Sequence, residues 1–209
     1  MARVAAVMSK PVVAADQTKT KTTTIRRRGD ETALHWSKYS ELSEEEQAEC
    51  LDVCRRLTDA VYEGLDLKYE IAAVNMQRLG DTVLLWDRNN HDNTGGERER
   101  IRRRLMGLAV CHCGAGSEAG SNMCYVKVGA VKPGPNAAGV FGQLLNVCEE
   151  LARSQGMSRL VAGVNTGRHE AYRKMIAHGF RTDIQGVAMQ RYNEPGYNQP
   201  DVYLIDDWR

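Results

Sequence analysis

One stretch of the sequence, residues 123–179, limits the possible folds more than any other. An apolar run, Tyr125–Val131, leads into a loop that contains Gly134, and an amphipathic pattern then continues from Ala138 to Gln155. These patterns predict a strand, a loop and a helix. The first backbone N–H groups of a helix have no partner within it, and the helix dipole makes that end partly positive. The stretch therefore predicts a place where an anion such as a phosphate can bind without a Lys or Arg side chain.

The same stretch continues with the patterns of a second strand, Arg159–Val164, and a second helix, Arg168–His178. The connection between the two strands is long enough for a parallel crossover. The sequence contains no G-x-x-x-x-G-K-[ST], and no G-x-G-x-x-G follows the first strand. These two absences exclude a Walker loop and the dinucleotide-binding fingerprint.

Several short motifs follow one another in this region. Val131 and Pro133 stand at the end of the strand, Gly139 stands near the start of the helix, and Leu144-Leu145 lie within it. Downstream, segment 171–180 begins with Ala and ends with Gly-Phe. In this order and spacing the motifs resemble those of the GNAT superfamily of N-acetyltransferases, over roughly residues 105–180. Two positions depart from the family pattern: Asn136 stands where Arg or Gln is usual, and Phe141 where Gly or Ala is usual.

The resemblance implies that acetyl-CoA binds between two central strands that splay apart, with its pantetheine arm filling the gap like an extra strand. Backbone groups of Gly129, Ala130 and Val131 would then pair with the pantetheine amides. It also implies that Asn165 contacts the pantetheine or a water, and Arg168 could contact CoA phosphates at the start of its helix. The pyrophosphate would bind the backbone N–H groups of consecutive residues: Asn136, Ala137, Ala138, Gly139, Val140, Phe141 and Gly142.

The general acid of the family is missing from its usual place. Many members carry a Tyr four residues before the glycine of the Gly-Phe pair, but here that residue is Met175, which precedes Gly179. A thioether cannot donate a proton. Tyr172 lies three residues earlier, on roughly the same helical face,. Tyr172 is therefore the candidate catalytic acid, and the alternative is that it only packs.

The rest of the chain predicts an α/β fold, GNAT-like, with a mixed, mostly antiparallel sheet and flanking helices. Residues 1–21 lack periodicity and are expected to form a flexible tail, with one domain over 22–209,. Ser43 and Glu46 form a capping box before the helical pattern of residues 44–62,. Other expected elements are a strand at 22–28, a short helix within 30–42, strands at 82–88 and 105–113 that make a meander with the strand at 125–131, a strand at 180–192 with a bulge at Gly186, and a last strand at 202–208,.

Composition limits the location of the protein and the partners that it can bind. The formal net charge is +1, and no apolar run approaches the length needed to span a membrane, so a cytoplasmic protein is expected,. The sequence contains six cysteines and no C-x-x-C pair. This pattern predicts buried reduced thiols and no metal site. Glu99 interrupts the arginines of segment 98–104 and Glu97 precedes them, so nucleic-acid binding is not favoured. The aromatic C-terminal segment, residues 193–209, suggests a homodimer.

These observations lead to one main hypothesis and two alternatives. The main hypothesis is an N-acetyltransferase that transfers the acetyl group of acetyl-CoA directly to an amine, whose identity the residues do not reveal. The first alternative is a non-catalytic acyl-CoA-binding or structural module of the same fold, which the missing tyrosine favours. The second is a nucleic-acid-binding module that uses the arginines of segment 98–104.

Overall fold

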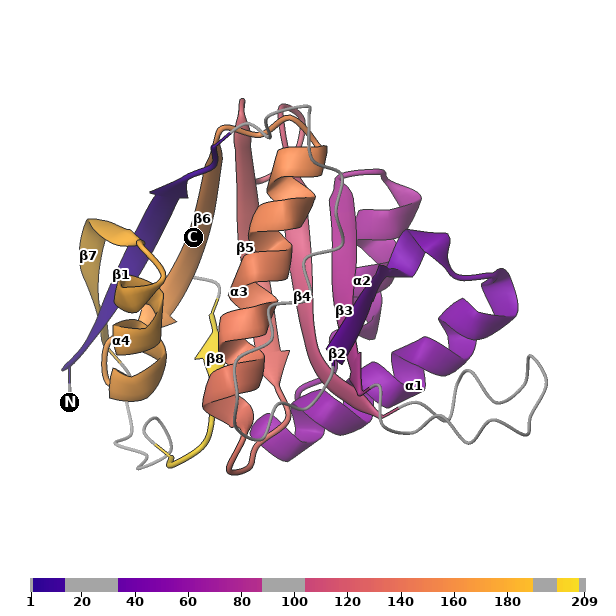
Figure 1. The fold of residues 1–209 in the computed structure, drawn as a ribbon, viewed down its shortest axis with the longest axis horizontal. Helices are drawn as coiled ribbons and strands as arrows, with labels where there is room; N and C mark the ends of the chain where they lie inside the picture. The colour runs from indigo at the N-terminus through magenta and orange to yellow at the C-terminus, as the bar shows by residue number, and fades with distance from the viewer. Residues whose placement is uncertain (1, 14–33, 88–103, 190–198, 207–209) are drawn as a thin grey trace.

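The computed structural model describes residues 2–13, 34–87, 104–189 and 199–206 (Figure 1). The predicted strand at 22–28 and all but the last residue of segment 98–104 lie outside these ranges, as do residues 193–198 and 207–209 of the C-terminal segment. The helices are α1 (Glu44–Val61), α2 (Lys68–Met76), α3 (Ala137–Ser154) and α4 (His169–Ala177), with a 3-10 turn at Tyr39–Glu41. The strands are β1 (Ala2–Pro11), β2 (Leu34–Lys38), β3 (Gly80–Asp87), β4 (Leu105–Cys113), β5 (Met123–Val131), β6 (Arg159–Asn165), β7 (Arg181–Met189) and β8 (Leu204–Ile205).

The strands form one mixed, mostly antiparallel sheet, as the sequence predicts for an α/β fold. Its order is β2-β3-β4-β5-β6-β1-β7, and β8 pairs with β5 outside this path. The predicted meander is confirmed, because β3, β4 and β5 are consecutive antiparallel neighbours. The predicted crossover is also confirmed, since β5 and β6 run parallel and α3 connects them.

Two hydrophobic cores lie on opposite faces of the sheet. Alternate residues of each strand point to opposite faces, so neighbours such as Leu84 and Leu85 belong to different cores,. Helices α3 and α4 cover one face, and α1 and α2 cover the other. Figure 1 shows α3 running along the sheet in front of β5 and β4. No helix in the described ranges is long and apolar enough to cross a membrane.

The N-terminal segment is a strand inside the sheet, so the expectation of a flexible tail over residues 1–21 is wrong for its first half. Strand β1 pairs antiparallel with β6 on one side and β7 on the other. Met8 and Ala6 are fully buried beneath the α3–α4 face. The apolar stretch at the N-terminus is short and is followed by polar residues. Only its pairing with two distant strands makes it an inner strand of the sheet.

Three other predictions need correction. The segment within 30–42 contains strand β2 and a 3-10 turn instead of a helix, because residues 34–38 pair with β3. The irregularity in β7 faces the Val7/Met8 step of β1, whereas Gly186 pairs regularly with Ala5. Within the described residues the last strand is Leu204–Ile205 and begins later than the predicted residue 202, and residues 207 and 208 of the prediction lie outside the described ranges.

The predictions for α1 and β4 are confirmed. Ser43 accepts from the backbone N–H of Glu46, and the Glu46 carboxylate accepts from the Ser43 N–H, which is the expected capping box. Helix α2 was not predicted. Only Ile71 and Val74 of α2 are buried, so its apolar periodicity is too short to stand out in the sequence,.

Met8→Ala tests the position of β1. Because Met8 is fully buried, truncation should lower the free energy of unfolding by about 2–5 kcal/mol,. Urea denaturation measures this change. Val13→Ala, at an exposed position just after the strand, is the control and should change it by less than about 0.5 kcal/mol,. Equal, small effects would place the N-terminal segment outside the core.

Candidate functional site

The two parallel central strands separate at an irregularity in β5. The β4–β5 register pairs Val110 with Val128 but Cys111 with Val126, so Lys127 is an extra residue in β5. Such a bulge bends a strand and increases its local twist. The parallel ladder to β6 covers only residues 123–126 of β5 and stops at the same point. From Lys127 onward, the two strands leave a gap between them.

Residues 203–206 of the same chain fill this gap. Gly129 pairs with Ile205 and Ala130 with Leu204, and the Val131 N–H donates to the Tyr203 carbonyl at 3.4 Å. On the other side, the Asp206 N–H donates to the carbonyl of Gly163 in β6 at 3.2 Å. Figure 1 shows β8 between the lower ends of β5 and β6. The backbone edge of Gly129, Ala130 and Val131, which the resemblance assigns to pantetheine, is therefore occupied by β8.

Side chains on both faces hold this segment. The Tyr203 ring lies 5.2 Å from the Phe141 ring, measured between centroids. Ile205 is buried on the α3 side and Leu204 on the α1–α2 side. A Cβ atom on Gly129 would come 3.2 Å from Ile205 Cδ1, so Gly129 gives Ile205 the room to pack against β5.

An ion pair anchors the end of the segment. Arg168 Nη1 lies 2.7 Å from Asp206 Oδ1, and both side chains are largely buried. Burial raises the pKa of the Asp206 carboxyl, and the charge and hydrogen bond of Arg168 partly offset this rise,. The sequence suggested that Arg168 contacts CoA phosphates, but in the structure Arg168 binds a carboxylate of the protein itself.

The start of α3 offers fewer backbone donors than the sequence suggested. The N–H of Ala137 donates to the Gly134 carbonyl at 2.9 Å, and that of Val140 donates to the Asn136 carbonyl at 3.1 Å. In a regular helix the N–H groups of Phe141 and Gly142 bond to the residues four positions earlier. The donors without an acceptor inside the helix are therefore Ala138 and Gly139.

Gly139 and Gly142 differ in their surroundings. Gly139 is exposed, and a Cβ atom there would meet nothing within 4 Å. At Gly142, a Cβ atom would lie 3.0 Å from both His178 Nε2 and Lys174 Cε. Gly142 therefore allows α3 and α4 to pack closely, whereas Gly139 leaves an open surface beside the free N–H groups.

Tyr172, the predicted acid, points away from the gap. Its hydroxyl lies 3.3 Å from the Thr182 hydroxyl on β7. Because β1 lies between β7 and β6, Thr182 is on a strand roughly 10 Å, or two strand spacings, from β6,. Met175 is buried in the core beneath α4. The structure therefore does not bring Tyr172 to the gap.

Asn165 lies at the end of β6 and is almost completely buried. Its Oδ1 atom accepts a hydrogen bond from the Gly167 N–H at 2.9 Å. Its Nδ2 atom is buried and has no hydrogen-bond partner in the described part of the chain. A buried donor without a partner is costly, so a ligand or water that accepts from Nδ2 would be stabilised there.

A charged cluster that the sequence did not reveal lies beside the bulge. The Lys127 ammonium is 2.6 Å from Glu118 and 3.2 Å from Glu70, and His112 Nε2 is 3.3 Å from the same Glu70 oxygen. Three of these side chains, Glu70, His112 and Glu118, have donor atoms close enough to hold a metal. Lys127 already supplies a cation to both carboxylates, so the cluster is a closed salt-bridge network. These residues come from α2, β4, β5 and a loop, and no motif connects them.

The cysteines agree with the expectation of reduced thiols. All six are free, and only Cys113 is not fully buried. The Cys50 and Cys54 sulfurs lie 3.8 Å apart within α1.

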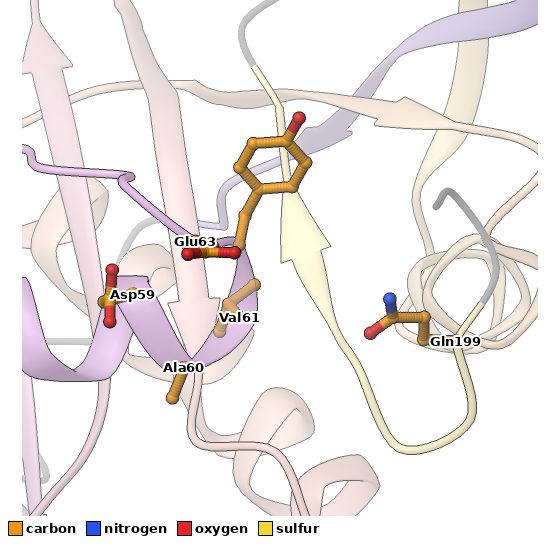
Figure 2. A pocket seen from close by; sticks show the side chains of 6 residues that line it. Asp59, Ala60, Val61, Glu63 and Gln199 are labelled. Carbon is orange, nitrogen blue, oxygen red and sulfur yellow. The ribbon is translucent and has the colours of Figure 1, made fainter. Parts of the chain in front are cut away.

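A surface hollow of about 460 Å³ opens at the end of α1. Figure 2 shows Asp59, Ala60, Val61 and Glu63 on one side of it and Gln199 on the other, near β8. Two carboxylates make its rim acidic, although the Asp59 carboxylate already accepts from the Gly64 N–H.

No protein-family model matches this sequence, and no curated protein matches it.

His178→Gln tests the contact between α3 and α4. Burial lowers the pKa of His178, as do Lys174 and Lys10, while Glu149 opposes them. The folded state then binds fewer protons than the unfolded chain, so the free energy of unfolding should fall as the pH drops below the ordinary value of 6.5,. Urea denaturation at about pH 7.5 and about pH 5.5 should show a smaller fall in His178→Gln than in the wild type. The control is His169→Gln, at an exposed position of α4. Its free energy of unfolding should fall as much between the two pH values as that of the wild type.

Proposed function

We propose that this protein is an N-acetyltransferase that uses acetyl-CoA and transfers the acetyl group directly to an amine. The observation that carries the proposal is the gap between β5 and β6, whose β5 edge bonds to an extended chain. Pantetheine is also extended and carries two amides, so it suits the same backbone groups. Burial on both sides of the gap would keep water away from the thioester.

The start of α3 supports the binding of the CoA phosphates. The gap ends where β5 leads into this helix, so a chain in the gap emerges beside the N–H groups of Ala138 and Gly139. The helix dipole favours a negative charge there. The unpartnered Asn165 Nδ2 atom is a further donor at the end of β6. We therefore assign the phosphates to the N–H groups of Ala138 and Gly139 instead of to the whole range Asn136–Gly142.

The chain's own part in the chemistry is mainly positioning. The amine nitrogen must be neutral to attack the thioester carbonyl carbon, and the C–S bond breaks as the C–N bond forms. The sulfur then takes a proton, for which we invoke water or the amine itself, because Tyr172 is bonded to Thr182. No cysteine in the chain is exposed to act as a nucleophile, which fits direct transfer,. The free thiols also agree with our proposal of a cytoplasmic setting.

A second candidate is a non-catalytic module of the same fold. The observation that favours it is the filled gap, since β8 occupies the β5 edge. A thiol-release assay of acetyl-CoA with a panel of amines and peptides separates the two candidates. Amine-dependent thiol release supports the enzyme. Binding of acetyl-CoA without release on any amine supports the module.

Gly139→Trp tests the phosphate site. The open surface around Gly139 should accommodate the indole without disturbing the fold, but the ring should cover the N–H groups of the first turn. Calorimetry should show acetyl-CoA affinity reduced at least about tenfold, or 1.4 kcal/mol. Asn146→Trp, at an exposed position further along α3, is the matched control and should bind like the wild type. Unchanged affinity in Gly139→Trp would reject this location for the phosphates.

Tyr172→Phe tests the missing acid. Because the hydroxyl bonds to Thr182, kcat should stay within about twofold of the wild type, whereas loss of a general acid typically costs about 10²–10⁴-fold,. Thr182→Val removes the same hydrogen bond from its other side. Both variants should lose a similar amount of stability, about 1 kcal/mol. A large drop in kcat for Tyr172→Phe alone would restore the catalytic role.

A further inference from the structure

The backbone holds residues 203–206 more weakly than it holds a regular strand. Strand β8 contains two residues, and within the described part of the chain its ladder consists of two pairs, with Gly129 and Ala130. The flanking hydrogen bonds, at 3.4 and 3.2 Å, are longer than the usual 2.9–3.0 Å,. By contrast, β4 and β5 share a ladder that runs from Gly107 to Cys113. Separation of β8 would therefore break few backbone bonds.

Side chains also attach these residues. The segment inserts Leu204 and Ile205 into opposite faces, stacks Tyr203 near Phe141, and ends with the Asp206–Arg168 pair. A short extended chain with alternating side-chain pockets is how a peptide binds to the edge of a sheet. Here that peptide is part of the same chain.

We propose that residues 203–206 are a tethered, displaceable occupant of the gap, and that acyl-CoA binds by exchanging with them. This inference rests on the proposed function, because it takes the pantetheine arm as the competing ligand. Both would use the same β5 edge, so the Val131 N–H can bond to only one of them at a time. The apparent affinity for acyl-CoA is then the intrinsic affinity reduced by the fraction of molecules in which the gap is open.

The double variant Ala130→Cys/Leu204→Cys can lock the segment in place. These two residues face each other, and the Val131–Tyr203 hydrogen bond beside them makes them a non-hydrogen-bonded pair. Cα atoms in such a pair are about 4.5 Å apart, within the range that a disulfide spans. The oxidised variant should bind acetyl-CoA at least about tenfold more weakly than the same variant after reduction.

Calorimetry on the full chain measures both forms, and mass spectrometry confirms the new disulfide. Wild-type protein treated with the same oxidant is the control for the native thiols. Equal affinity in the locked and reduced forms would overturn the exchange while leaving the proposed function intact. If neither the reduced variant nor the wild type binds acetyl-CoA, the proposed function fails, and the following measurement decides whether the segment opens.

Asp206→Asn tests the opening of the segment without any ligand. This variant keeps the Asp206 backbone N–H but removes the ion pair with Arg168. Hydrogen exchange at the amides of residues 131 and 206 should become at least about tenfold faster, while exchange within β4 stays as in the wild type. The matched control, Asp183→Asn at an exposed position of β7, should leave all these amides unchanged. If these amides exchange in Asp206→Asn at the wild-type rate, the idea of a displaceable segment is overturned, whether or not acetyl-CoA binds.

Discussion

The short parallel ladder between β5 and β6 is the constraint on which the rest of the structure depends. Its four pairs join two halves of the sheet, and it ends where Lys127 adds a residue to β5. Beyond that point each strand edge would expose N–H and C=O groups inside the protein, which is costly without partners. Something extended must therefore fill the gap, and in this chain β8 does so.

The filled gap links the two candidate functions. If residues 203–206 never leave the gap, their contacts with Phe141 and Arg168 simply complete the core. If it exchanges with an extended ligand, the same contacts set how often the gap is open. The difference between a structural module and an enzyme then depends on a free energy of opening, and a change of a few kcal/mol is enough to shift the population greatly.

The sequence predicted more of the fold than of the site. The resemblance placed a cofactor edge at Gly129–Val131, and the backbone there does bind an extended chain, although that chain is β8. The position of the Tyr172 hydroxyl could not be predicted, because spacing along a helix says nothing about which strand the hydroxyl meets, here Thr182 of β7. The cluster around Lys127 was missed because Glu70 and His112 are far apart in the sequence and meet only across α2 and β4.

The sequence by itself determined the elements that depend on nearby residues. The capping box of Ser43 and Glu46 starts α1, and the apolar periodicity of α3 orients it on the sheet, because both effects act within a few turns of one helix,. Only the tertiary structure decided that β1 is an inner strand and that Tyr203–Asp206 enters the gap. A backbone edge accepts any extended chain, so the choice of partner depends on side-chain contacts between distant segments, which local patterns do not encode.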